Sequence, residues 1–185
     1  MIKFYESDAI VIVYEGNTEK YILEMLLEQD AFAFESWQLL DNRMFKRTNT
    51  QHRNALENQY FPMDFGKSRL VVLLVQDDDA DLKIDDVFRY KITGPVFVVT
   101  KPEIEMLMVH SLGQYDAYQK ARSKNHQLKP SEFVAGEFGV TTSRLKSQTF
   151  VMDFYEKHSL IDAIKRHSEK ARREPNQYFL NDILK

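Results

Sequence analysis

Three runs of apolar residues stand out along the first hundred positions of the chain. They are residues 9–14 (AIVIVY), 70–76 (LVVLLVQ) and 96–100 (VFVVT), each rich in β-branched side chains. Continuous apolar runs of this length are typical of strands that are buried on both faces of a sheet. Because helical patterns separate the runs, we expect an α/β protein with a mainly parallel sheet and helices on both faces.

The pattern between and beyond these runs is mainly helical. Asn17 or Thr18 can cap a helix that runs to about Asp30, and Pro102 suits the first turn of a helix that ends near Ser123. Further helices are expected at residues 52–60, 84–90, 142–157, 159–173 and 176–184, and a further strand at residues 34–40. We therefore predict an α/β domain over residues 1–125 and a helical C-terminal extension over residues 126–185, packed together as one compact unit.

The composition narrows the class of protein. The 185 residues are 43% apolar and carry a net charge of -3, as in ordinary soluble globular proteins. The chain has no cysteine, which excludes disulfide scaffolds, cysteine-ligated metals and thiol nucleophiles. Its longest apolar stretch, residues 70–75, is far shorter than the roughly 20 residues that span a bilayer, and the N-terminus lacks a signal-peptide pattern. We expect a cytoplasmic protein without a membrane segment.

Positive charge is concentrated in three tracts, at residues 43–54, 119–130 and 165–173. They hold 4, 4 and 5 of the 25 lysines and arginines, and Glu169 is the only acidic residue within them. Such segregation suits a polyanion, such as a nucleic acid, that approaches an acidic pocket filled by cations. Solvated helix faces and loops are the alternative interpretation.

Carboxylates follow two of the predicted strands. Glu15 stands at the end of the first strand, Gly16 allows the chain to turn, and Glu19 projects from the first turn of the next helix. Asp77 and Asp79 follow the second apolar run and point to the same side, because side chains alternate along an extended chain. Ligands bind at the carboxyl ends of parallel strands and Mg²⁺ prefers oxygen ligands, so these carboxylates are candidate metal ligands. Alternatively, the glutamates only complement the helix dipole and the aspartates belong to a solvated acidic loop.

Glu105 is a further candidate. On a helix that starts at Pro102, it falls within the apolar arc, whereas Glu103 and His110 lie on the opposite, polar side. A carboxylate on an apolar face needs a partner, because burying it alone costs several kcal/mol. That partner is either a metal ion or Lys101, four residues earlier.

The order of these motifs resembles the Toprim fold. Glu-Gly-x-Thr-Glu at residues 15–19 resembles the OLD-type nucleases, with Asp77-x-Asp79 and Glu105 following on later elements. The stretch at residues 101–110 is similar to the short phage-resistance proteins called RloB or AbiLii. The match covers residues 9 to about 112.

The resemblance implies a Toprim/Rossmann-like nuclease that cleaves DNA or RNA with two divalent cations, Mg²⁺ or Mn²⁺. Its ligands would be Glu15, Glu19, Asp77, Asp79 and Glu105, with one glutamate free to act as general base. OLD-type sites also place a downstream basic residue on the scissile phosphate, and Lys146 and Arg144 are the candidates here. The OLD ATPase domain has no counterpart in this chain, so the resemblance implies a protein partner that supplies a trigger. Phage defence is the role that the resemblance suggests. The three basic tracts would grip backbone phosphates.

A degenerate Toprim domain that binds nucleic acid or a protein without cutting is the main alternative. A phosphoacceptor receiver domain is rejected, because only 22 residues separate Asp78 from Lys101. The sequence also lacks the glycine-rich Gly-x-x-x-x-Gly-Lys-Ser/Thr loop of nucleoside triphosphatases and the Gly-x-Ser-x-Gly turn of serine hydrolases.

Overall fold

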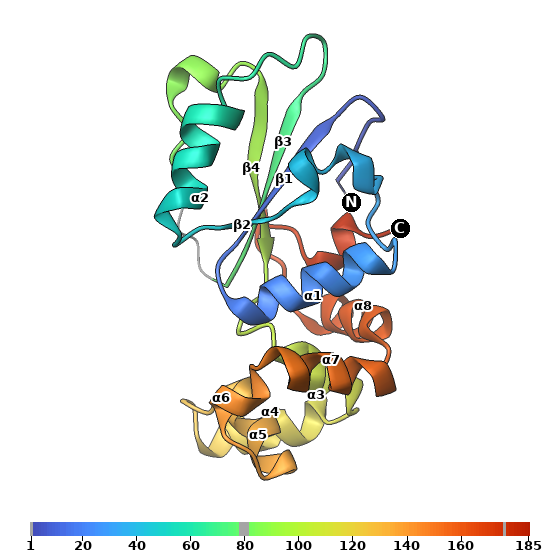
Figure 1. Ribbon diagram of the computed structural model, residues 1–185. Coiled ribbons are helices and arrows are strands. Elements are labelled where there is room, and N and C mark those ends of the chain that lie inside the picture. The colour runs from blue at the N-terminus through green and yellow to red at the C-terminus, as the bar shows by residue number, and fades with distance from the viewer. Residues whose placement is uncertain (1, 78–81, 176) are drawn as a thin grey trace.

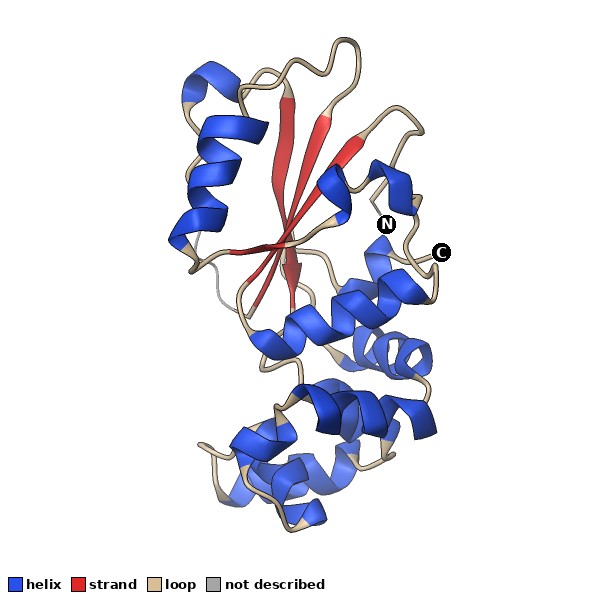
Figure 2. Ribbon diagram, in the orientation of Figure 1, coloured by secondary structure: helices blue, strands red, loops and turns tan. Residues whose placement is uncertain are grey.

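Four parallel strands form the centre of the molecule (Figures 1 and 2). The computed structural model describes residues 2–77, 82–175 and 177–185. The strands are β1 (Ala9–Tyr14), β2 (Phe45–Lys46), β3 (Leu70–Gln76) and β4 (Ile92–Val99), in the order β2-β1-β3-β4. Because every pairing is parallel, the carboxyl ends of all four strands meet at one edge of the sheet. The predicted α/β fold with a parallel, Rossmann-like sheet is confirmed.

Helices lie on both faces of this sheet (Figure 2). They are α1 (Asn17–Glu28), α2 (Thr50–Ala55), α3 (Met106–Ser111), α4 (Tyr115–Lys124), α5 (Pro130–Phe138), α6 (Thr142–Leu145), α7 (Gln148–Lys157) and α8 (Leu160–Lys170). A π-helical turn at Leu56–Tyr60 continues α2, so the helix expected at residues 52–60 is confirmed in substance.

Alternating side chains of β3 explain why both faces are covered. Residues 71, 73 and 75 enter a large apolar cluster with side chains of α1, α3 and α8. Residues 70, 72 and 74 enter a second cluster with Leu56 and Tyr60, which follow α2. Successive side chains of a strand point to opposite faces, so a continuous apolar run needs a cover on each side.

Two strand predictions need correction. Residues 34–40 form no strand; they contain a 3-10 turn at Ser36–Gln38, and only Leu39 makes an isolated bridge to β1. The fourth strand of the sheet is instead the two-residue β2. The last strand begins earlier than expected, at Ile92, so the Gly94-Pro95 pair lies inside β4, where the pairing with β3 shifts its register.

The helices beyond β4 are shorter and more numerous than expected. The segment predicted as one helix over residues 102–123 is α3 and α4, separated at Gly113, whose φ of 67° is left-handed. Residues 142–157 likewise form α6 and α7, because the Ser147 side chain caps a new helix. Residues 84–90 and 176–184 contain only short 3-10 turns in the part that the structure describes. The helix predicted from Ser159 is confirmed, and its hydroxyl accepts the N–H of Asp162.

The two ends of the chain lie side by side (Figure 1). The N–H of Ile2 donates to the carbonyl of Asp182 at 3.2 Å, and Val98 of β4 makes a parallel bridge to Tyr178. No helix within the described ranges is long and apolar enough to cross a membrane.

Candidate acidic active site

An acidic cavity of about 500 Å³ opens at the carboxyl edge of the sheet. Glu15 follows β1 and Asp77 follows β3, as the sequence predicted. α1 contributes Glu19, the segment between β4 and α3 contributes Glu105, and the end of α6 contributes Lys146. The remaining residues that line it are Gly16, Asn17, Thr18, Glu103, Ile104 and Ser143. The cavity thus brings together residues that are distant in the sequence, from Glu15 to Lys146.

Gly16 makes room for the carboxylate of Glu19. Gly16 is the N-terminal cap of α1, and a Cβ atom built there would collide with the Glu19 carboxylate. The side chain therefore folds back over the first turn of the helix, where the N–H of Glu19 itself donates to it. Glu19 is 8% exposed, so glycine at this position permits a buried carboxylate.

Glu105 is the most deeply buried acid of the cavity, at 2% exposed. One carboxylate oxygen, Oε2, lies 3.5 Å from Nζ of Lys146, and the Thr18 hydroxyl donates to the same carboxylate group. The other oxygen, Oε1, is buried and accepts no hydrogen bond from any described residue. Lys146 also lies 3.5 Å from Glu103, so one lysine serves two acids.

Burial and the close approach of several acids shift the pKa values of the groups in the cavity. Burial, together with the negative charges of Glu105 and Asp77, raises the pKa of Glu19 to about 7, against the opposing effect of Lys146. Burial also raises the pKa of Glu105, although Lys146 and Thr18 oppose the change. Burial lowers the pKa of Lys146, but Glu105 and Glu103 outweigh it and the net direction is upward. The ionised carboxylates therefore have too little positive charge around them.

Glu15 also lines the cavity and is partly exposed. Its Oε1 accepts a 2.6 Å hydrogen bond from Nη2 of Arg47, which belongs to the basic tract at residues 43–54. Its Oε2 is buried and has no hydrogen-bond partner within the described ranges. Two of the acids, Glu15 and Glu105, thus each have a buried oxygen without a partner among the described residues.

The donor set suits a hard divalent cation. Mg²⁺ and Mn²⁺ prefer carboxylate oxygens and water, and a cation would satisfy the two buried oxygens and the repelling charges together. Among the described residues, no three His, Cys, Asp or Glu side chains stand close enough to hold an ion as they are placed.

Most of the site residues predicted from the sequence lie in this cavity. The structure brings together Glu15, Glu19, Asp77, Glu105 and Lys146. Asp79, and with it the acidic run at residues 78–81, lies outside the described residues. Of the two basic candidates, Lys146 lines the cavity and Arg144 is exposed outside it. The ion pair that the structure gives Glu105 is with Lys146, not with Lys101 as the alternative interpretation had it.

Two placements made from helical periodicity were wrong. Glu103 lines the cavity, where Ser131 donates to it through its N–H and its hydroxyl. His110 was expected on the polar side of the helix but is 4% exposed. For Glu103 the reason is that α3 begins at Met106 rather than at Pro102, so the residues before it do not follow the helical period. His110 lies within α3 and is buried against His167 of α8. Glu103 carried no sequence signal beyond its place between Pro102 and Glu105.

Comparison with known proteins adds nothing to these observations. No protein-family model, no curated protein and no solved structure matches the chain. The resemblance to the Toprim fold therefore rests on the motifs alone.

Proposed function

We propose that the acidic cavity is the active site of a divalent-metal-dependent nuclease that cleaves phosphodiester bonds of DNA or RNA. The observation that carries this proposal is the pair of buried carboxylate oxygens, on Glu15 and Glu105, without a partner among the described residues. Burying a carboxylate is costly unless a positive charge offsets it, and Lys146 is the one cation that lines the described part of the cavity. A cofactor cation would offset the remainder.

Glu15, Glu19, Asp77 and Glu105, together with Asp79, would hold the ions. Two such cations supply an activated water and stabilise the charge on the leaving oxygen. The protein's own part is to orient the carboxylates: β1 and β3 place Glu15 and Asp77, and the Gly16 turn places Glu19. Thr18 fixes Glu105 through a hydrogen bond.

Lys146 is the residue best placed to meet a substrate phosphate. Its ammonium group lies between Glu103 and Glu105, 3.5 Å from each, and its side chain is 40% exposed. The group can therefore contact solvent and the acids together. Cations that neutralised the acids would leave Lys146 available for a phosphate oxygen.

Basic side chains border the cavity, as a polyanionic substrate requires. From the tract at residues 43–54, Arg47 contacts Glu15, and Lys46 donates to Asn17 at 2.9 Å. From the tract at residues 119–130, Lys129 lies 3.9 Å from Glu103. These contacts support the proposal that a nucleic-acid backbone approaches from this side. A role in phage defence, with a partner that supplies the trigger, belongs to the same proposal.

The test is cleavage of labelled single-stranded DNA, double-stranded DNA and RNA with Mn²⁺ or Mg²⁺. We expect cleavage of at least one substrate, abolished by EDTA, and a loss of at least about a hundredfold in Glu105→Gln. Glu28→Gln is the matched control, because Glu28 is exposed at the far end of α1. Equal cleavage by Glu105→Gln and wild type would refute the site. Metal-independent binding without any cleavage would support the non-catalytic alternative.

A further inference from the structure

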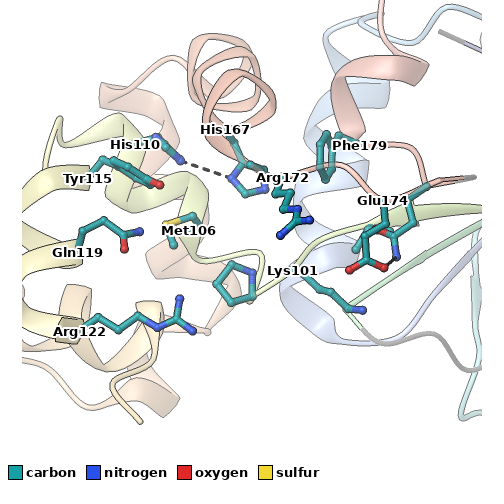
Figure 3. Close-up of a pocket in the computed structure, with 14 residues that line it drawn as sticks. Lys101, Met106, His110, Tyr115, Gln119, Arg122, His167, Arg172, Glu174 and Phe179 are labelled. Atoms are coloured by element: carbon teal, nitrogen blue, oxygen red, sulfur yellow. Dashed lines mark hydrogen bonds between the residues drawn. The ribbon is translucent and has the colours of Figure 1, made fainter. Parts of the chain in front are cut away.

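A second cavity, of about 320 Å³, is lined by the start of the segment that joins β4 to α3 (Figure 3). Lys101 and Pro102 line this cavity, whereas the next residues, Glu103 to Glu105, line the acidic one. The other walls come from α3, α4 and the segment that follows α8. Its volume falls in the range of about 300–1,000 Å³ that is usual for small-molecule sites.

Two arginines from distant parts of the chain extend toward the middle of this cavity (Figure 3). Arg122 belongs to α4 and Arg172 follows α8, so the basic tracts at residues 119–130 and 165–173 meet here. Neither arginine forms an ion pair with an acid in the described ranges, and both are exposed. Glu174 is the one acid among the described lining residues. The cavity is therefore positively charged, in contrast to its neighbour.

Part of the cavity lining is apolar. Met106, Pro102 and Phe179 supply apolar surface. The imidazoles of His110 and His167 lie in the wall, with Nε2 of the first 3.4 Å from Nδ1 of the second. Burial lowers the pKa of each ring to about 4, so both are neutral at physiological pH. They supply ring surface and hydrogen-bonding atoms, while the arginines supply the charge.

We propose that this cavity binds a small organic phosphate with a flat ring, of which a nucleoside monophosphate is the simplest example. Two guanidinium groups aimed into one space suit a phosphate, because each can donate two parallel hydrogen bonds. The apolar part of the lining suits a planar ring, and the volume of about 320 Å³ suits a single nucleotide. This site is independent of the nuclease proposal, because none of its ligand-facing residues lines the acidic cavity.

The first measurement is isothermal titration calorimetry of the full chain with adenosine monophosphate. We expect saturable binding with a dissociation constant below about 1 mM, and weaker binding of adenosine and of inorganic phosphate. Arg122→Gln and Arg172→Gln should each weaken binding roughly tenfold. Lys124→Gln is the matched control: it removes the same charge from the same helix, at a residue that does not line the cavity. Glu105→Gln should leave binding unchanged.

The second measurement places the ligand. The side-chain nitrogen resonances of His110 and His167 should shift on addition of adenosine monophosphate, and those of exposed His126 should not. Absence of binding at millimolar ligand, or an equal loss in Lys124→Gln, would overturn the proposal. So would equal affinity for inorganic phosphate alone, which would indicate an anion site without a ring pocket. Much tighter binding of an oligonucleotide through the same arginines would assign the cavity to a nucleic-acid path instead.

Discussion

Burial of the Glu19 carboxylate destabilises the folded state when Glu19 is ionised, yet the proposed function needs this carboxylate in the cavity. The carboxylate is buried above the first turn of α1, and its pKa of about 7 means that the ionised form is unfavourable in the metal-free protein. A carboxylate kept for structure would be paired, and its pKa would fall. Acids whose pKa is raised in a cavity are characteristic of functional sites, where stability is given up for chemistry.

We predict that Glu19→Gln stabilises the metal-free protein in a pH-dependent way. The native state prefers protonated Glu19, so its contribution is fully favourable below pH 4.5 and is lost as the pH rises through about 7. The rise of the pKa from 4.5 to about 7 corresponds to about 3 kcal/mol. Urea unfolding in EDTA should show the variant gaining on wild type between pH 4.5 and 8. The exposed control, Glu28→Gln, should show no such trend. If the stability of Glu19→Gln changed with pH in parallel with that of wild type, the prediction would be contradicted.

Lys146 stabilises the acidic cavity, because its positive charge offsets the negative charges of Glu103 and Glu105. Lys146→Gln leaves Glu103 and Glu105 without their shared partner. We expect a loss of about 1–2 kcal/mol in EDTA, since Lys146 is 40% exposed and water screens part of the interaction. Added Mn²⁺ should raise the melting temperature of the variant more than that of wild type. Arg144→Gln removes the same charge two residues away and should change neither value; an equal loss there would show a general charge effect.

At the scale of elements, β1, β3 and the helix after β1 were predictable from the sequence. Their apolar runs are long enough, and their ends are marked by Glu15-Gly16 and Asp77. The edge strand β2 was not, because two residues, Phe45 and Lys46, carry no pattern and the strand exists only through its pairing with β1. The strand predicted at residues 34–40 is absent for a different reason. Phe34 and Leu39 are apolar because they pack into the core, not because they belong to a strand of the sheet.

The candidate site was predictable only in part. The carboxylates at the strand ends follow from parallel topology, which puts those ends at one edge. Glu105 was found buried as expected, but the expectation rested on a helix that in fact begins at Met106. Glu103 and the pairing of His110 with His167 depend on tertiary contacts between distant segments, which no local pattern encodes.

β4 contains a position where only glycine fits. Gly94 has a φ of 121°, and a Cβ atom there would lie 2.7 Å from the carbonyl oxygen of Val72 on β3. We predict that Gly94→Ala destabilises the protein by about 1–3 kcal/mol, because both the backbone conformation and the neighbouring strand oppose it.

Gly136 supplies the matched control for that substitution. It lies within α5 and has nothing within 4 Å of an added Cβ. Gly136→Ala should therefore stabilise the protein by about 0.5–1 kcal/mol through helix propensity. Urea denaturation of both variants checks the two signs, and a neutral effect of Gly94→Ala would mean that β3 and β4 can separate locally.

At the scale of the whole molecule, the sheet and the C-terminal helices share one core. The larger apolar cluster contains Ile12 of β1 and Val109 of α3 as well as Val151 of α7 and Ile164 of α8. The acidic cavity likewise takes Lys146 from beyond residue 125. A substrate or an ion in that cavity would therefore contact both parts of the predicted domain organisation, and its binding should stabilise the whole chain rather than the sheet alone.

The contact between α3 and α8 should make the molecule sensitive to acid. His110 on α3 and His167 on α8 face each other, with Arg166 and Lys170 of α8, Tyr115 of α4 and the carbonyl of Lys101 around them. Burial lowers the pKa of both rings from 6.5 to about 4, and for His110 the positive charges of Arg166 and Lys170 contribute to that value. The unfolded chain therefore binds more protons than the native one between pH 6.5 and 4.

Stability contributed by the neutral rings is thus complete above pH 6.5 and is lost as the pH falls toward 4, by about 3 kcal/mol for one ring. Urea unfolding at pH 7.0, 5.5 and 4.5 measures the loss, and His167→Gln should reduce it while His126→Gln, in an exposed loop, should not. Titration of the ring nitrogens by NMR gives the same answer without a variant. Rings that titrated near pH 6.5 would show that water reaches the α3–α8 contact, and acid would then leave the packing of the C-terminal helices on the sheet intact.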